Sequence, residues 1–497
     1  MIFFWFFLLF AWCGDWLDFL AYLARVQQGS IAAVVLAAAL AGWVPMRLLQ
    51  PCVDRADRAP MDRAAWVILV LMGGFFLFKA AVPDTSTDVE YYHLYLQSPG
   101  FRDVFGQNFA PAALGSVIYP LADRLFYWFR MLLGYRLGTV LNCLLAMLVF
   151  FQVRDLYLSF WRAHWGASVL AGASVLVYQL VMQLGGSYMV DLVALPLLLE
   201  MLRCALFAPA RQKGDVYYFA FLAAAVLTVK LNNVFYVLPL GLWFLWHSRR
   251  LLSFRCLALS LAVLWLPGSL YAVYSFLETG SPLYPFYNAI FQSPYFPVLN
   301  VLDSENRWGP VSWAERLCWP WHLALYPGYR LCELVEPLAA AHLGGLLAAV
   351  CFLLWGLWSR SWREGHALEW GLGLVFLGSA YCWTFLSGYA RYFLFGMILG
   401  NIVFVRGLFL LRGCGWRRLT AVLLVPLLLA PVLAFYETGL GHEWSWRERR
   451  FHSGYRQELG RFLRDRQLVS AEQAAQVGAF VQLDVHGSAY AHIIRPD

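Results

Sequence analysis

Long apolar runs alternate with short polar segments along most of this chain. A helix needs about 20 apolar residues to cross the hydrocarbon core of a bilayer. The pattern therefore predicts an all-α protein, a polytopic transmembrane helical bundle of about 12–13 spans. The predicted spans are 2–22, 31–49, 64–83, 137–153, 167–184, 189–207, 216–229, 233–246, 256–276, 338–358, 367–386, 390–411 and 419–436.

Polar residues interrupt two of these stretches. Asp15 and Asp18 fall within the first run. The stretch 216–246 is too long for one helix and is broken by Lys230 and by a neighbouring pair of asparagines. We expect two short helices that form a hairpin, with the polar residues at its tip.

Arginine and lysine predict which side of the membrane each loop faces. Short basic loops remain on the cytoplasmic side, and all six basic loops fall there if the spans alternate. These loops are 50–63, 154–166, 208–215, 247–255, 359–366 and 412–418. The N-terminus is then inside and the tail 437–497 outside. The start of the tail is basic and argues the other way, but long segments translocate largely regardless of charge.

The longer loops then lie outside the cytoplasm. The chain divides into an N-terminal transmembrane hairpin (1–63), a transmembrane domain (64–436) with outer loops 84–136 and 277–337, and a small extracytoplasmic tail (437–497).

Both outer loops are expected to lie against the membrane surface. The first contains an apolar stretch, Phe109–Phe126, that is too short and polar to span and is expected to lie along the interface. The second is rich in Pro, Tyr and Trp.

Composition supports a membrane protein. Of 497 residues, 61% are hydrophobic and 13% charged, about half the charged fraction of soluble proteins. The net charge of +7 does not require nucleic acid as a partner, because most basic residues lie in short loops between apolar runs. Lipids are the expected surroundings.

Three of the 37 basic residues are lysines: Lys79, Lys213 and Lys230. Lys79 is expected to extend outward from the end of its span. Glu200 and Arg203, three residues apart, are expected to pair.

The ten cysteines show no spacing typical of zinc or redox sites. Cys318 and Cys332 share an outer loop, where a disulfide can form. Their spacing alone leaves a bond and two free thiols equally open.

The densest polar cluster runs from Asp84 to His93 (DTSTDVEYYH), directly after the third run. A carboxylate at the mouth of a helix bundle can act as a general base. A nearby histidine can orient that carboxylate or bind a phosphate. The alternative is a solvated polar start of a loop.

Asp88-Val-Glu90-Tyr-Tyr92-His93 resembles the D-x-x-x-Y-H pattern in the first large outer loop of many bacterial GT-C membrane glycosyltransferases. These enzymes use polyprenyl-phosphate sugars. The resemblance covers residues 64–436 and implies that Asp88 is the catalytic base. It places Glu90, Tyr92 and His93 at the substrate.

Two further segments resemble this superfamily. Asp191, in Ser187-Tyr-Met-Val-Asp191, resembles its second acidic position, which helps to bind a divalent metal or the acceptor. The alternative is a carboxylate favoured by a helix N-terminus. Lys230 resembles the cation that a hairpin tip presents to the lipid phosphate. Alternatively, Lys230 only extends toward water.

Arg391 and Tyr392, in Gly-Tyr-Ala-Arg391-Tyr392, resemble the Arg-Tyr pair of the superfamily. The guanidinium would clamp phosphate oxygens, or it only anchors the helix at the interface. The segment Glu278–Asn288 resembles a T-G-N-P-x-F-P-F segment, although Ser281 replaces the usual Asn. It would stack on a sugar or cover a lipid groove, or form a rigid loop without such contacts.

The resemblance implies inverting transfer of a sugar from a polyprenyl-phosphate donor to a glycan, lipid or protein acceptor. The reaction would occur on the periplasmic face of a bacterial inner membrane. Asp88 would deprotonate the acceptor, and Lys230 and Arg391 would stabilise the leaving phosphate. A divalent cation at Asp88 and Asp191 is the one cofactor that the resemblance allows.

Two other functions are compatible with the sequence. A polysaccharide polymerase or ligase would place its chemistry in an outer loop with Arg307, Arg316, His322 and Arg330. A lipid or solute transporter usually shows internal repeats, and the sequence shows no repeat pairing.

Overall fold

The described part of the chain consists of helices and the turns between them. The computed structural model describes residues 2–23, 63–80, 84, 89, 93, 121–160, 172–176, 179–207, 212–284, 286–293, 298, 309–325, 339–359, 367–423 and 425. No β-strand occurs within these ranges. The all-α prediction is confirmed for them.

The helices follow the predicted runs closely. Their bounds are α1 (Ile2–Leu23), α3 (Arg63–Ala80), α5 (Leu121–Gly138), α6 (Val140–Phe160), α8 (Gln179–Leu184), η2 (Val190–Leu192), α9 (Ala194–Leu202), η3 (Arg203–Phe207), α10 (Lys213–Val229), η4 (Leu231–Asn233), α11 (Val234–Ser248), α12 (Phe254–Thr279), α13 (Asn288–Phe291), α14 (Trp313–Leu325), α15 (Ala339–Ser359), α16 (Ala367–Leu386), η7 (Ala390–Phe393) and α17 (Leu394–Gly413). The run 31–49, most of the run 419–436 and the tail 437–497 lie outside the described residues.

The hairpin predicted around Lys230 is confirmed. Lys230 is extended (φ −161°, ψ 118°), so α10 ends there and α11 begins after the short turn η4. Asn233 closes the turn by donating from Nδ2 to Val226 O at 3.2 Å. Local signals also set the ends of α12, where Ser253 Oγ accepts from Cys256 N at 3.2 Å and Gly280 takes a left-handed φ of 76°.

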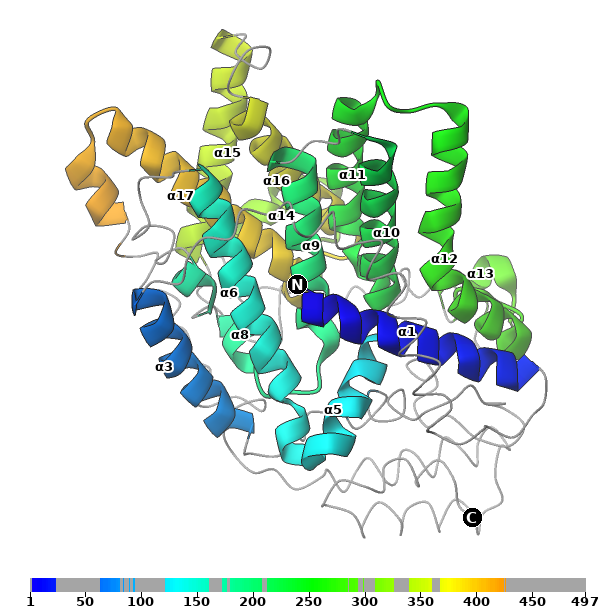
Figure 1. Ribbon diagram of the computed structural model, residues 1–497. Coiled ribbons are helices and arrows are strands. Elements are labelled where there is room, and N and C mark those ends of the chain that lie inside the picture. The colour runs from blue at the N-terminus through cyan, green and yellow to red at the C-terminus, as the bar shows by residue number, and fades with distance from the viewer. Residues whose placement is uncertain are drawn as a thin grey trace.

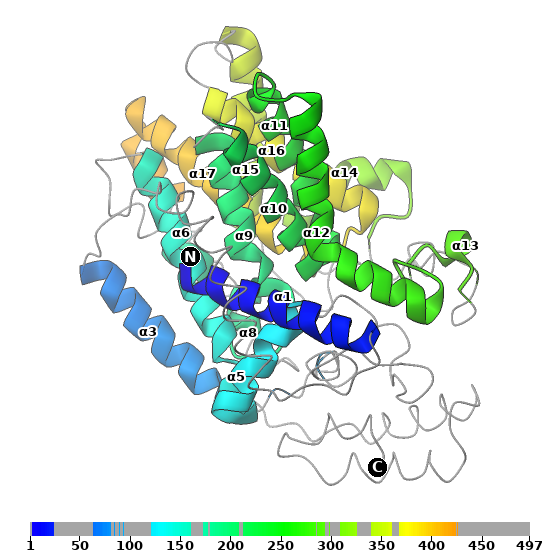
Figure 2. The ribbon, with the colours of Figure 1, turned by 45° about the vertical axis from the view of Figure 1, so that its right-hand side comes forward.

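Six helices lie side by side with roughly aligned axes, although neighbours such as α10 and α11 run in opposite chain directions (Figure 1). They are α9, α10, α11, α12, α15 and α16. Their buried apolar side chains belong to one continuous core. α1 is helical as expected, but it crosses this group at a steep angle in both views (Figures 1 and 2). It contacts α5 and α12, where Asp15 pairs with Arg124 (Oδ1 to Nε, 3.3 Å) and accepts a hydrogen bond from Tyr271 Oη.

Three helices of the described ranges are long and apolar enough to cross a membrane: Val140–Leu158, Phe254–Thr279 and Ala390–Gly413. Large apolar side chains also face outward, such as Phe254 (90% exposed) and Trp358 (93% exposed). Such exposure suits a lipid environment. The count of 12–13 spans stays a prediction, because several runs are shorter or interrupted helices. The run 189–207, for example, divides into η2, α9 and η3.

Three described helices, α5, α13 and α14, lie wholly or mostly in the segments predicted to be outer loops. α5 overlaps only the end of the apolar stretch Phe109–Phe126, and it extends to Gly138 with a kink at Gly134 (φ 78°). The rest of that stretch lies outside the described residues. α14 occupies part of the loop 277–337. Charged residues lower the hydropathy of α5, although Asp123 and Arg124 are buried in the structure.

One expectation from the sequence is wrong. Lys79 does not extend outward, because its side chain is buried and Nζ donates to Met182 O at 2.7 Å. The expected pair of Glu200 and Arg203 is confirmed, with Nη2 and Oε1 2.5 Å apart.

The backbones of α15 and α17 approach closely at Gly345. A Cβ atom added there would lie 2.5 Å from Gly400 O. Small residues permit such contacts between membrane helices.

We predict that Gly345→Ala forces α15 and α17 apart and lowers the free energy of unfolding by about 1–3 kcal/mol. Gly241→Ala in α11 is the matched control, because its added Cβ would meet nothing within 4 Å. Removing a helical glycine there should stabilise by about 0.5–1 kcal/mol. Thermal unfolding in detergent measures both, and equal shifts for the two variants would contradict the close contact.

Candidate functional site

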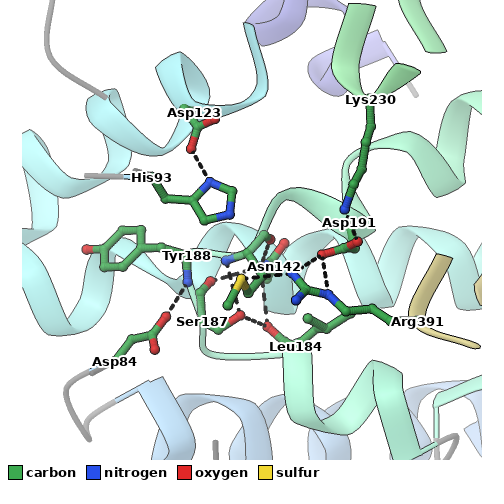
Figure 3. A network of polar contacts seen from close by, with 11 residues as sticks. Asp84, His93, Asp123, Asn142, Leu184, Ser187, Tyr188, Asp191, Lys230 and Arg391 are labelled. Carbon is green, nitrogen blue, oxygen red and sulfur yellow. Dashed lines mark hydrogen bonds and ion pairs between the residues drawn. The ribbon is translucent and has the colours of Figure 1, made fainter. Parts of the chain in front are cut away.

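Asp191 is a buried carboxylate paired with two cations (Figure 3). Lys230 Nζ lies 2.6 Å from Oδ1, and Arg391 approaches Oδ2 with Nη2 at 3.0 Å and Nε at 3.3 Å. The side chains of Asp191 and Arg391 are each 6% exposed, whereas that of Lys230 is 23% exposed. Residues far apart in the sequence thus form one ion cluster, here named the Asp191 cluster, with Lys230 as its most accessible member.

Asn142 of α6 fixes the segment that carries Asp191. Its Nδ2 donates to the backbone oxygens of Leu184, Ser187 and Met189 at 3.3, 2.8 and 2.8 Å. Buried carbonyls need such partners, so one side-chain amide holds the turn between α8 and η2. Asp191 lies in η2, directly after that turn.

Lys230 reaches the cluster from the tip of the α10–α11 hairpin. It lies outside the regular helix, so its backbone is not buried in the middle of a span. Its Nζ also lies 4.7 Å from the centroid of the Tyr392 ring. An ammonium over an aromatic face gains a cation–π interaction, so Tyr392 is a second partner for this lysine.

Arg391 lies in η7, between α16 and α17, and its backbone is clamped on both sides. Trp383 Nε1 donates to Tyr389 O at 2.8 Å, and Tyr236 Oη donates to Tyr392 O at 2.7 Å. The guanidinium is buried against Asp191, so Arg391 is an interior ion partner. It does not act as a surface anchor.

The start of the predicted outer loop contacts the same segment. Asp84 Oδ2 accepts a hydrogen bond from Tyr188 N at 2.7 Å. Tyr188 lies three residues before Asp191 in the sequence. Tyr135 Oη donates to Asp84 O, and Tyr188 Oη donates to Tyr135 O. These bonds join the residue Asp84, which follows α3, to α5 and to the turn before η2.

A second buried pair joins His93 to α5. His93 Nδ1 lies 2.7 Å from Asp123 Oδ1, and each side chain is 3% exposed. Burial raises the pKa of the Asp123 carboxyl, while the charges of His93, Arg124 and Lys230 lower it.

Asp123 was missed in the sequence. It falls in a stretch that was expected to lie along the interface and belongs to no motif. A carboxylate in the first turn of a helix is a weak signal, because the helix dipole favours it there in any protein.

The Asp191 cluster lies at the end of its hairpin opposite to exposed basic residues. Lys230 ends α10, whereas Lys213 begins it, and a helix of 17 residues is about 26 Å long. Arg249 and Arg250 are exposed just after the far end of α11, and Arg255 is exposed at the start of α12. The cluster and these basic residues therefore mark opposite ends of the helices (Figure 1).

The structure brings together the predicted site residues that it describes. These are His93, Asp191, Lys230, Arg391 and Tyr392. The remaining predicted residues, Asp88, Glu90 and Tyr92, lie outside the described residues. Asp191, Lys230, Arg391 and Tyr392 are linked by direct contacts. His93 forms a separate buried pair with Asp123.

A divalent cation at Asp191 would need free carboxylate oxygens. Both oxygens of Asp191 already contact a cation, and a dication there would be repelled by Lys230 and Arg391. The described residues contain no group of three or more His, Cys, Asp or Glu side chains that could hold a metal ion. Asp88 lies outside these residues, so the metal site at Asp88 and Asp191 stays a prediction.

The segment after α12 is held by its own hydrogen bonds. Ser281 is fully buried, and its backbone oxygen accepts from Ser275 Oγ at 2.7 Å. Asn288 bonds the backbone of Ser293 in both directions, at 2.7 and 3.1 Å. A rigid loop is what these contacts establish, and stacking on a sugar stays a prediction.

The residues of the rival polymerase or ligase function lie partly within the described ranges. Arg316 of α14 lies over the rings of Trp313 and Phe385, at 5.2 and 6.0 Å. His322 packs beside Trp319. Arg307 and Arg330 lie outside the described residues, as does Cys332, the predicted partner of Cys318.

Comparison of the chain with protein-family models, with curated proteins and with solved structures gives no significant match.

We predict that Asn142→Asp unfolds the turn before η2, because a carboxylate would face three carbonyl oxygens. The expected loss is about 3 kcal/mol or more in the free energy of unfolding. Gln152→Glu on the same helix is the control, since Gln152 Nε2 donates to Pro196 O at 2.9 Å. The unfolding temperature should fall much further for Asn142→Asp than for Gln152→Glu. Similar decreases for the two variants would contradict the role of Asn142 in holding the turn.

Proposed function

We propose that this chain is a multi-span membrane glycosyltransferase. It would transfer a sugar from a polyprenyl-phosphate donor to an acceptor on the periplasmic face of a bacterial inner membrane, with inversion at the anomeric carbon. One observation carries the proposal: Lys230 and Arg391 meet at Asp191, at the hairpin end opposite to the exposed basic residues.

This arrangement suits a lipid phosphate. The donor carries its negative charge at the membrane surface, where a lysine supplies a point charge and a nearby arginine adds a second positive charge. Because basic residues mark cytoplasmic loops, the opposite end of the hairpin faces outward. That side is where the 12–13-span topology places the long loops.

The proposed reaction forms one bond and breaks another. The acceptor oxygen or nitrogen attacks the anomeric carbon while Asp88 takes its proton. The bond from that carbon to the phosphate oxygen breaks, and polyprenyl phosphate leaves with the electron pair. Lys230 and Arg391 stabilise the charge on the leaving phosphate.

The residues on either side of Asp88 support its role as the base. Asp84 and His93, which flank it in the sequence, both contact residues next to the Asp191 cluster. The chain from Asp84 to Asp88 covers four residues, a reach of at most about 14 Å.

The direct test is glycosyl transfer by purified protein in nanodiscs. Radiolabelled polyprenyl-phosphate sugars are the donors, and membrane extract supplies the acceptor. We expect Lys230→Met to lower the transfer rate by about 100-fold, as for loss of one charge-stabilising group. Lys213→Met, at the other end of α10, should retain wild-type activity.

Equal activity of the two lysine variants would remove Lys230 from the site. Consumption of lipid-linked oligosaccharide without transfer from any monosaccharide donor would indicate a polymerase or ligase instead. Movement of lipid across the bilayer without either reaction would indicate a transporter.

Asp88→Asn keeps the size of the side chain but cannot accept the proton. We expect it to bind the donor as the wild type does and to lose transfer by a factor of about 100 or more. Unchanged turnover in a folded Asp88→Asn protein would rule out this base. Donor binding, measured by the shift in unfolding temperature, confirms that the site is intact.

A further inference from the structure

Asp191 occupies the position that an anionic ligand of Lys230 and Arg391 would take. Its two oxygens each contact one of the cations, at 2.6 Å and 3.0 Å. One carboxylate and two cations leave the cluster with one net positive charge. A carboxylate of the protein itself thus already lies between the two cations, although the three side chains together carry a net positive charge.

The two cations are held very differently. Arg391 is buried, contacts Asp191 through both Nε and Nη2, and has Met189 Sδ 3.1 Å from Nη2. Lys230 contacts Asp191 through one nitrogen on a flexible side chain that is more exposed. The ammonium of Lys230 also lies over the ring of Tyr392, which is a second interaction partner for it. Lys230 is therefore the partner that can leave Asp191 at low cost.

We propose that Asp191 is an internal counter-anion that competes with the lipid phosphate for Lys230. When the phosphate arrives, Lys230 turns from Asp191 to the phosphate, while Arg391 remains bound to Asp191. The inference rests on the proposed function, because it assumes a phosphate ligand at Lys230.

This role differs from that of a metal ligand or an acceptor-binding residue. A counter-anion keeps two neighbouring cations charged and in place while the site is empty, since unpaired buried charges are strongly disfavoured. It also weakens the binding of every phosphate, including the polyprenyl phosphate product. Asp191 therefore favours product release.

The proposal predicts that removing the charge of Asp191 raises the affinity for polyprenyl phosphate. The probe is a short-chain polyprenyl phosphate without a sugar, titrated into the detergent-solubilised full-length protein. Asp191→Asn removes the competing charge and preserves the side-chain shape, so we expect it to bind the probe at least about tenfold more tightly than the wild type. Affinity that is unchanged or weaker in Asp191→Asn overturns the proposal.

Glu200→Gln is the matched control. Glu200 is a similarly buried carboxylate, 7% exposed, that pairs with Arg203 on the same segment. Its loss should leave the affinity for the probe unchanged. A tenfold gain in this variant as well would show that loss of any buried carboxylate has the effect, and would overturn the specific role of Asp191.

Asp191→Asn leaves two cations without their counter-ion, so a second measurement covers the case in which the variant does not fold alone. In that event the proposal requires that inorganic phosphate or the polyprenyl phosphate, present during purification, restores folded protein. Failure of both anions to restore it overturns the proposal. A wild-type protein that does not bind the probe overturns the proposed function itself, which distinguishes the two failures.

Discussion

A charge removed from water must lie opposite a charge of the other sign, and this requirement organises the described structure. Ion pairs join separate elements at three places: Asp15–Arg124, Glu369–Arg406, and Asp191 with its two cations. Between membrane helices apolar contact alone gives little preference for one neighbour over another, because lipid is equally apolar. Pairing of charges supplies that preference and determines which helices meet.

Among the ion pairs described above, the Asp191 cluster joins one carboxylate to two cations. Glu200 has Arg203 as a cationic partner, and Glu369 has Arg406. Asp191 has two, and they arrive from the hairpin tip and from η7. One carboxylate therefore joins three separate segments of the chain.

Hydrophobic run length predicted most helices, because a span must satisfy its backbone internally whatever its neighbours are. It also located the break at Lys230, where a charged residue and two asparagines interrupt an apolar stretch. It failed for α5, whose charged residues are buried by pairing with distant segments. Hydropathy counts such residues as polar, whereas the fold neutralises Arg124 with Asp15.

Motifs located Asp191, Lys230 and Arg391 individually, but their convergence on one carboxylate depends on tertiary structure. The same is true of Asp123, whose partner His93 is 30 residues away. The direction of Lys79 was wrong for a related reason. Its inward bond to Met182 depends on where α8 packs, and no local pattern encodes that.

The length of the hairpin has a consequence for the surrounding lipid. α10 has 17 residues and α11 has 15, which correspond to about 26 and 22 Å. Under the proposed topology both are shorter than a hydrocarbon core of about 30 Å. A bilayer adapts to short helices by thinning around them. The bilayer would then be locally thinner beside Lys230. The headgroup of a polyprenyl lipid would lie at the depth of the hairpin tip while the lipid remains in its leaflet.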